Sequence, residues 1–377
     1  MALTPRIPRL RRNHTLPRGG NRVALHHDGA ACLAAMLDAI QNAKHEILLE
    51  MYWFGSDQTG QRFAAALEAR ARQGVLVCVS YDAVGSWESD PEQFEVMRRA
   101  GCHVRVYNPI RPRWTRLRSS HRRNHRKLLV VDGLIGMTGG VNLADPWAPV
   151  SEGGGGFRDN LICIEGPAVA DMRAIFATTW GWRHALPQRP VPMPTGSVTV
   201  AVIANDRRRN RRRIERAYLH AIRNARRRVL IENSYFVPTW SVRSSLRRAA
   251  MRGVQVSIVL PSVSDVPLVQ FATRRSYEHL LQAGVRLFEW GPSVLHSKIA
   301  VVDDWCTVGT HNLDYRSWLY NLEINVSIEN AGLASELTTR IERAIAESAR
   351  LDAKVWAMRP LAERVMEEFL YRFRYFL

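Results

Sequence analysis

The chain carries an internal duplication, which constrains its fold more than any other feature of the sequence. Residues 39–54 (AIQNAKHEILLEMYWF) match residues 221–236 (AIRNARRRVLIENSYF), and each segment reads as the end of an amphipathic helix, a basic turn and a strand. Two further pairs keep the same order, 71–82 with 250–261 and 100–109 with 283–292. Because the offset between partners stays at 179 to 183 residues, a whole unit of helices and strands is repeated.

The alternation of helices and strands in each copy predicts an α/β fold. We expect two similar halves, each a mixed β-sheet flanked by helices, related by a pseudo-twofold axis with the active site between them. A length of 377 residues, of which 46% are hydrophobic, is enough to build a core in both halves.

A proline-rich stretch separates the two copies. Residues 184–197 (HALPQRPVPMPTGS) contain four prolines, a composition that ends helices and favours an extended connection. The predicted domains are a basic N-terminal arm at 1–22, a first half at 23–183, a linker at 184–197, a second half at 198–330, and a C-terminal helix with an aromatic and basic tail at 331–377.

Each half contains the same polar cluster after its third matched segment. Both copies fit the pattern H-x-K-x4-D: His125, Lys127 and Asp132 in the first half, and His296, Lys298 and Asp303 in the second. A histidine and a lysine two positions apart on a strand point to one face, while the four apolar residues that follow bury the rest of the strand. The pattern therefore predicts a site into which both polar groups project.

Each cluster is followed by small residues and an asparagine, and then by a carboxylate. GMTGGVN ends at Asn142 and TVGTHN ends at Asn312, and these amides are expected to bind substrate phosphate. Asp159 and Glu323 follow the histidine of their own half by 34 and 27 residues. A carboxylate on the far imidazole nitrogen would fix the tautomer, although both residues also fit ordinary charges on edge strands.

Two such clusters indicate transfer of a phosphodiester group without a metal ion. One histidine attacks phosphorus to form a phosphohistidine, and the other protonates the leaving alkoxide and later deprotonates the acceptor. The paired lysines and asparagines hold the equatorial oxygens. The five cysteines are scattered and form no metal-ligand pattern, so we expect no metal and no cofactor.

These motifs resemble the phospholipase D superfamily over residues 21–330. Within it the chain is most similar to bacterial cardiolipin synthases of the short type without transmembrane helices. The resemblance implies that His125 is the nucleophile and His296 the general acid and base. Asp132 and Asp303 belong to the catalytic motif, but we expect them to brace the strand ends. The chain departs from the family at Thr310-His311, where a histidine so near the site either tunes it or faces solvent.

The charge of the chain predicts an anionic partner. Lys and Arg number 53 against 35 Asp and Glu, a formal charge of +18. Residues 111–127 hold eight basic residues, read either as a guide for an anionic head group or nucleic-acid backbone, or as a solvated loop. Residues 207–213 hold six arginines, expected to meet phosphates at a surface. The tail 369–377 (FLYRFRYFL) suits a membrane interface or a strap on the core. Glu50 and Glu232 either line the mouth of the site or pair with arginines.

Three functions remain open at this point. The first is a phosphatidyltransferase that makes cardiolipin from two phosphatidylglycerols and releases glycerol, peripheral to the cytoplasmic face of the cell membrane. Its partners are phospholipid substrates and an anionic membrane surface, and one chain suffices without oligomerisation. The second is a phospholipase D-type phosphodiesterase or nuclease with the same two histidines, for which nucleic acid is the partner. The third is a binding protein with a decayed site, ranked last because both motifs are intact.

Overall fold

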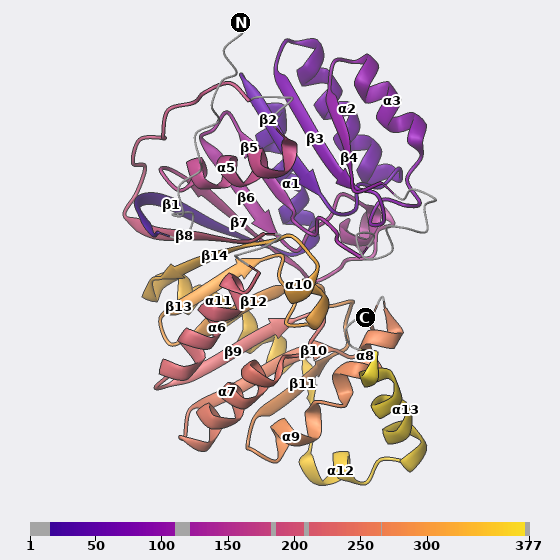
Figure 1. Cartoon of the computed structure of the whole chain (residues 1–377), viewed down its shortest axis with the longest axis vertical. Helices are drawn as coiled ribbons and strands as arrows, with labels where there is room; N and C mark the ends of the chain where they lie inside the picture. Colours follow the sequence, from indigo (N-terminus) through magenta and orange to yellow (C-terminus); the bar gives the residue numbers. More distant parts are fainter. Residues whose placement is uncertain (1–15, 110–120, 182–185, 207–210, 265, 374–377) are drawn as a thin grey trace, which may run out of the picture.

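The computed structural model describes residues 16–109, 121–181, 186–206, 211–264 and 266–373 (Figure 1). Its first half contains the strands β1 (Arg18–His27), β2 (Glu46–Met51), β3 (Leu76–Asp82), β4 (His103–Tyr107), β5 (Leu128–Val131), β6 (Ile135–Gly139) and β7 (Asn160–Glu165). Its helices are α1 (Gly29–Gln41), α2 (Gln58–Arg72), α3 (Pro91–Arg99) and α5 (Val169–Trp180), with short 3-10 turns at Asp145–Trp147 and Val150–Glu152.

The second half repeats this series. Its strands are β8 (Val198–Asn205), β9 (Arg228–Asn233), β10 (Gln255–Pro261), β11 (Arg286–Trp290), β12 (Lys298–Val302), β13 (Trp305–Gly309) and β14 (Glu323–Glu329). Its helices are α6 (Arg213–Asn224), α7 (Trp240–Met251), α8 (Pro267–Arg274), α9 (Tyr277–Leu281), α10 (Tyr315–Leu319) and α11 (Ala331–Ala346). The C-terminal elements are β15 (Ser348–Arg350), α12 (Ala353–Ala357) and α13 (Leu361–Arg372).

The strands form one mixed sheet in which the two halves have the same strand order. Outward from the centre this order is β1-β7-β6-β5-β2-β3-β4 in the first half and β8-β14-β13-β12-β9-β10-β11 in the second, with β15 on the outer edge. The equivalent strands β1 and β8 pair antiparallel at the centre, through Arg18 with Val200 and Asn21 with Val198. Antiparallel pairing of equivalent strands is what a twofold axis produces, so the predicted fold class is confirmed.

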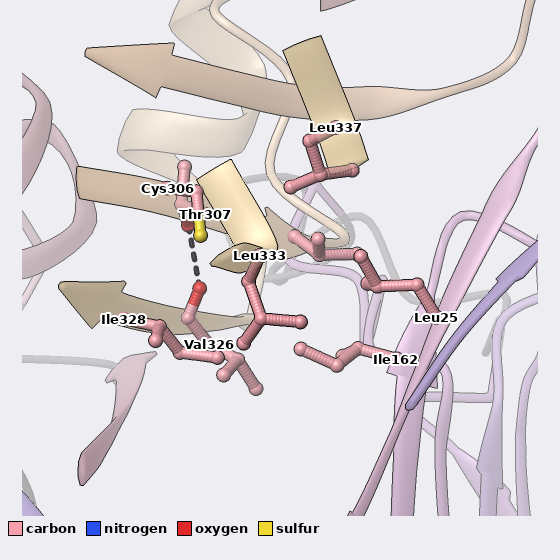
Figure 2. A pocket seen from close by; sticks show the side chains of 9 residues that line it. Leu25, Ile162, Cys306, Thr307, Val326, Ile328, Leu333 and Leu337 are labelled. Carbon is pink, nitrogen blue, oxygen red and sulfur yellow. Dashed lines mark hydrogen bonds between the residues drawn. The ribbon is translucent and has the colours of Figure 1, made fainter. Parts of the chain in front are cut away.

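Helices cover both faces of the sheet because side chains alternate along the buried strands. In β2, Leu48 packs with α5 in the core layer that also contains α11, whereas Ile47 and Leu49 pack with α1 to α3 on the other face. The layer under α5 and α11 is continuous across the two halves. Figure 2 shows this contact, where Leu25 and Ile162 of the first half meet Val326 and Leu337 of the second.

The domain limits remain a prediction. β1 begins at Arg18, inside the stretch assigned to the N-terminal arm. The part of the linker that the structure describes, 186–197, contains no helix or strand. Several segments singled out from the sequence lie outside the described residues: 1–15 of the arm, 110–120 and 207–210 of the basic runs, and 374–377 of the tail. Within the described ranges, no helix has both the length and the apolar character needed to span a bilayer.

The motif aspartates lie at the opposite ends of their strands from the histidines. Asp132 follows β5 and accepts hydrogen bonds from the backbone N–H groups of 44–46, at 2.6 to 2.9 Å. Asp303 follows β12 and accepts from the N–H groups of 226–228, at 2.8 to 3.0 Å. Both carboxylates hold the turn that leads into β2 or β9, which is the bracing of the strand ends expected from the sequence for these members of the motif.

This bracing predicts a loss of stability on substitution of the aspartate. We expect Asp303→Ala to lower the free energy of unfolding by about 1–3 kcal/mol, because three backbone N–H groups, one of them half-buried, lose their common acceptor. The φ of 53° at this residue adds strain for alanine. Denaturant unfolding measures the effect. Asp304→Ala is the matched control, since the Asp304 carboxylate forms an exposed ion pair with Arg227, worth less than about 1 kcal/mol. Equal losses in the two variants would contradict the assignment.

Candidate active site

The two histidines lie at the same edge of the sheet. His125 lies three residues before Leu128, the residue of β5 that pairs with Glu50 of β2. His296 lies two residues before Lys298, the residue of β12 that pairs with Asn233 at the end of β9. Both imidazoles are buried. The parallel strands β2 to β4 and β9 to β11 all end at this edge, which is the usual position of a site in an open α/β sheet.

Two short bridges between the halves fix the backbone of the histidines. The N–H of His125 donates to the carbonyl of Leu322 at 3.0 Å, beside an isolated parallel bridge between Asn124 and Leu322. The N–H of His296 donates to the carbonyl of Arg158 at 2.9 Å in the equivalent arrangement. His125 is thereby held against Leu322, which precedes Glu323, and His296 is held against Arg158, which precedes Asp159.

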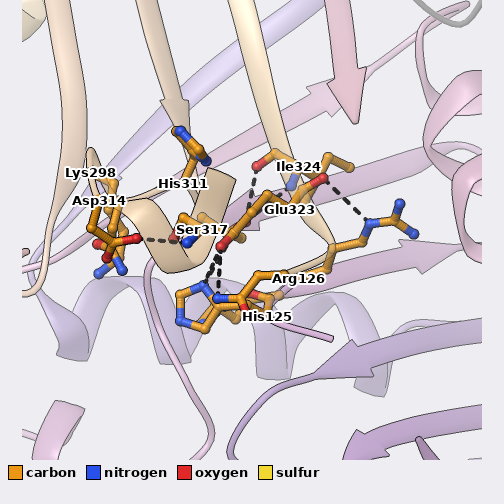
Figure 3. A network of polar contacts seen from close by, with 12 residues as sticks. His125, Arg126, Lys298, His311, Asp314, Ser317, Glu323 and Ile324 are labelled. Carbon is orange, nitrogen blue, oxygen red and sulfur yellow. Dashed lines mark hydrogen bonds and ion pairs between the residues drawn. The ribbon is translucent and has the colours of Figure 1, made fainter. Parts of the chain in front are cut away.

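The carboxylates pair with the histidines in a crossed manner. Nδ1 of His125 lies 3.0 and 3.1 Å from the two carboxylate oxygens of Glu323 (Figure 3). Nδ1 of His296 lies 2.8 Å from Oδ2 of Asp159. The residue pattern left open which histidine each carboxylate serves, and in the structure the pairing crosses between the halves. The reason is the pair of bridges, which bring the start of β14 to His125 and residue 158 to His296.

Further donors hold the two carboxylates in place. The indole Nε1 of Trp147 donates to Asp159 at 2.9 Å, and the hydroxyl of Thr310 donates to Glu323. Both carboxylates are fully buried. A carboxylate fixed in this way binds the Nδ1–H tautomer of its histidine and leaves Nε2 to face a substrate.

The lysines of both motifs are buried beside the histidines. The ammonium of Lys127 donates to the carbonyl of His125 at 3.1 Å and lies 5.0 Å from the centre of the Tyr52 ring. The ammonium of Lys298 donates to the hydroxyl of Ser234 at 2.8 Å and lies about 3 Å from the His296 ring nitrogens. The two lysine side chains thus lie beside the histidines in a site of low exposure.

The side-chain oxygens of the two motif asparagines accept hydrogen bonds from other residues of the protein. Oδ1 of Asn142 accepts from the N–H of Trp53 at 3.2 Å, and Oδ1 of Asn312 accepts from Ser234 at 2.9 Å. Because the oxygen of each amide is bound in this way, its NH2 group is the part that can donate to a phosphate oxygen.

Burial sets the protonation states of the first histidine and its partners. Burial lowers the pKa of His125 to about 4, against the opposing effect of the Glu323 carboxylate. Burial alone would raise the pKa of Glu323, but the adjacent His125 imidazole holds it at about 2. Burial, and then the charge of Lys298, lower the pKa of Lys127 to about 7. At neutral pH His125 is therefore a neutral imidazole beside an ionised carboxylate.

The unusual His311 is buried, so it does not face solvent. Its Nδ1 has no hydrogen-bond partner among the described residues, and burial lowers its pKa to about 4. Nearby, burial raises the pKa of Asp314 to about 7, while its Oδ1 accepts from the N–H of Ser317 (Figure 3). The equivalent residues of the first half are Val141 and Ala144, both in its apolar core. The surroundings of the two motifs therefore differ in polarity.

The glutamates at the strand ends are ion-pair partners of arginines. Glu232 binds Arg158 through two contacts of 3.1 and 3.2 Å, and Glu50 lies 3.8 Å from Arg126. All four side chains are buried, which favours the second of the two readings of Glu50 and Glu232. Arg126 belongs to the basic run at 111–127, so part of that run is in the core rather than in a solvated loop.

Several residues of the site were not predicted. Trp147 and Ser234 bind Asp159 and Lys298, and the Tyr52 ring lies 4.9 Å from that of His125. Tyr52 and Ser234 both belong to the segments matched in the duplication, and they occupy the same position in the alignment of 39–54 with 221–236. The duplicated segments could therefore have pointed to Tyr52 and Ser234 as site residues, whereas nothing in the sequence indicates that Trp147 belongs to the site.

Comparison with known proteins gives consistent matches over most of the chain. A family model described as "Cardiolipin synthase, PLD-like domain" matches residues 36–180 and 218–345. The major cardiolipin synthase ClsA of Bacillus subtilis is 32% identical over 94% of this chain and 75% of its own length. Cardiolipin synthase B of Escherichia coli K12 is 34% identical over 87% of this chain and 81% of its own.

A solved structure extends the likeness to the fold. The phosphatidylserine synthase of Haemophilus influenzae superposes with a TM-score of 0.74 and covers 97% of this chain and 98% of its own. The two sequences are 15% identical, so the match concerns the architecture of the sheet and its helices.

The buried His125–Glu323 pair makes a prediction about titration. We expect the His125 imidazole to stay neutral from pH 7 down to about pH 4, with its proton on Nδ1, because burial disfavours the charged ring. Glu323→Gln removes the charge that raises this pKa and should lower it further. Nitrogen-15 NMR of the imidazole measures both, with Asp304→Asn as an exposed control. A midpoint for His125 at its ordinary value would contradict the assignment.

Proposed function

The chain belongs to the cardiolipin synthase family of phospholipase D-like proteins and is a phosphatidyltransferase, and we propose on that premise that it joins two phosphatidylglycerols into cardiolipin and releases glycerol. One observation carries the proposal: two buried histidines, each hydrogen-bonded through Nδ1 to a carboxylate of the other half. This arrangement provides one nucleophile and one proton-transfer group in a single site.

In the first step, Nε2 of His125 attacks the phosphorus of one phosphatidylglycerol. A P–N bond forms and the P–O bond to the head-group glycerol breaks, while His296 gives a proton to the leaving oxygen. Glycerol departs and the phosphatidyl group remains on His125. The carboxylate of Glu323 stabilises the positive charge that develops on the imidazole.

In the second step, the acceptor is a hydroxyl group of another phosphatidylglycerol. His296 removes its proton, the oxygen attacks phosphorus, and the P–N bond to His125 breaks. The product is cardiolipin, and both histidines return to their initial states. The same intermediate gives phosphatidic acid when water replaces the lipid hydroxyl, so the transferase reaction requires the acceptor to reach phosphorus in preference to water.

The lysines and asparagines stabilise the charge on the phosphoryl oxygens. Lys127 and Lys298 are held by carbonyl and hydroxyl groups on both sides of the site, where low exposure strengthens their interaction with an anion. The NH2 groups of Asn142 and Asn312 are the matching donors. These four groups supply positive charge and donors of the kind that a divalent cation supplies in other phosphoryl-transfer enzymes.

The proposal includes the location of the enzyme. We place it at the cytoplasmic face of the cell membrane as a peripheral protein, supported by its net charge of +18 and by its lipid substrate. Both histidines and both carboxylates come from one chain, so the site is complete without oligomerisation.

Incubation with phosphatidylglycerol vesicles tests the reaction. We expect mass spectrometry to detect cardiolipin and free glycerol in equal amounts, in the presence of EDTA as well as in its absence. His125→Ala and His296→Ala should each abolish both products, because the steps need both groups, while Asp304→Ala should retain them. Phosphatidic acid without cardiolipin would make the protein a phosphodiesterase, and cleavage of DNA without lipid turnover would make it a nuclease.

The intermediate gives a second prediction about the identity of the nucleophile. Rapid quenching during turnover of phosphatidylglycerol labelled in its phosphate should leave label on the protein, stable to base and labile to acid as expected for a phosphoramidate. Peptide mapping should locate it at His125, and His125→Ala should remove it. Label on His296 instead would reverse the roles of the two histidines without changing the reaction.

A further inference from the structure

We propose that α13 and the loops around the active-site edge of the sheet form a surface that docks onto a bilayer containing anionic phospholipid. We call this set the docking face: residues 361–373, Trp87, Trp240, Val263 and Val266. The inference rests on the proposed function only in that a lipid substrate gives the mouth of the site a reason to lie against a membrane.

The first observation is the orientation of α13. Leu361, Val365, Phe369 and Phe373 are spaced four residues apart, which places them in one stripe of the helix. The four side chains are 45 to 73% exposed. A helix on a globular protein normally packs such a stripe against the core, yet this one leaves the stripe exposed along an open groove beside α9, which Leu361, Val365 and Phe369 line, and buries Glu367 instead.

The second observation is that other exposed apolar residues lie at the same edge of the sheet as the histidines. Trp87 follows β3 and Trp240 follows β9, with exposed fractions of 70% and 67%. Val263 and Val266 follow β10 and are also exposed. These loops leave the carboxyl ends of parallel strands, and those ends form the active-site edge in both halves. A single surface in contact with them would therefore face the mouth of the site.

The third observation is that contacts hold α13 at this edge. Arg275, which follows α8, forms an ion pair with Glu368 of α13 at 2.5 Å. Arg243, in the first turn of α7, donates to the Tyr371 hydroxyl at 3.3 Å, and the Tyr371 side chain packs against the cluster that contains Val237. Figure 1 shows α13 alongside α8. The apolar stripe is thus part of the folded second half and is joined to the loop after β9.

The charges beside the stripe favour an anionic bilayer as the occupant. Arg364 and Arg372 are exposed on α13 next to the apolar residues and line a groove of about 630 Å³ between α13 and α9. Arg364 lies 4.0 Å from Glu278 across this groove, which Glu367 and Glu368 also line, so Arg372 is the arginine of α13 that borders the stripe without such an ion pair among the described residues. Apolar side chains with arginines at their border match the boundary between acyl chains and phosphates. The net charge of +18 adds a long-range attraction to the same surface.

Vesicle co-sedimentation tests the docking face, with vesicles of phosphatidylcholine alone and of phosphatidylcholine mixed with phosphatidylglycerol. We expect the protein to bind the mixed vesicles more tightly. Trp240→Ser and Phe369→Ser should each weaken this binding by about tenfold, the size expected for one large apolar side chain. Leu134→Ser and Met251→Ser are matched controls, because both residues are exposed but lie at the opposite edge of the sheet, and they should bind as the unchanged protein does.

A second readout separates this inference from the proposed reaction. The ratio of turnover on vesicles to turnover on monomeric short-chain phosphatidylglycerol should fall in Trp240→Ser and Phe369→Ser, and should not change in the controls. The inference would be overturned if vesicle binding changed to the same extent in Trp240→Ser and Phe369→Ser as in the two control variants. A concentration-dependent dimer, seen by sedimentation and abolished by Phe369→Ser, would also overturn it, since a second copy would then cover the stripe. Vesicle binding with the expected pattern but no cardiolipin would overturn the proposed function alone.

Discussion

The crossed pairing of histidines and carboxylates is the interaction on which the rest of the site depends. His125 takes its carboxylate from the second half and His296 takes its carboxylate from the first, across the pseudo-twofold axis. Neither half therefore contains a complete pair. The packing between the halves, including the continuous core layer beneath α5 and α11, sets the geometry of the chemistry as well as the stability of the fold. A shift of one half relative to the other would separate both pairs at once.

Buried ion pairs hold the two strand segments that deliver these groups. Arg126 follows His125 and points to Glu50, while Arg158 precedes Asp159 and points to Glu232. The duplicated glutamates thus fix the neighbours of the site residues rather than the residues themselves. Burying a single charge has an unfavourable desolvation free energy, but in each pair the opposite charge replaces the lost solvent. Each ion pair also fixes the orientation of the segment that carries the neighbouring His125 or Asp159. The twofold arrangement is not complete, since His311 and Asp314 occupy positions that are apolar in the first half.

Much of this architecture could be predicted from the residues, and the failures have specific causes. The spacing of His125 and Lys127 places both on one face of a strand whatever the tertiary structure, so the motif was readable. The carboxylate partner of His125 was not readable, because it depends on the bridge at Leu322 that brings Glu323 of the other half to it. The motif aspartates were expected to brace the strand ends, and they do so at the end of each strand that lies away from its histidine. In α13 the four-residue spacing is visible in the sequence, whereas the exposure of the stripe depends on contacts made by other residues of the helix, such as Glu368 and Tyr371.

The antiparallel pairing of β1 with β8 places the corresponding parts of the duplication against each other within one molecule. Two separate half-length chains would have to meet before any histidine found its carboxylate, and the fraction of complete sites would fall on dilution. A covalent connection replaces that encounter by an effective concentration set by the linker. Both histidine–carboxylate pairs then form within the single polypeptide.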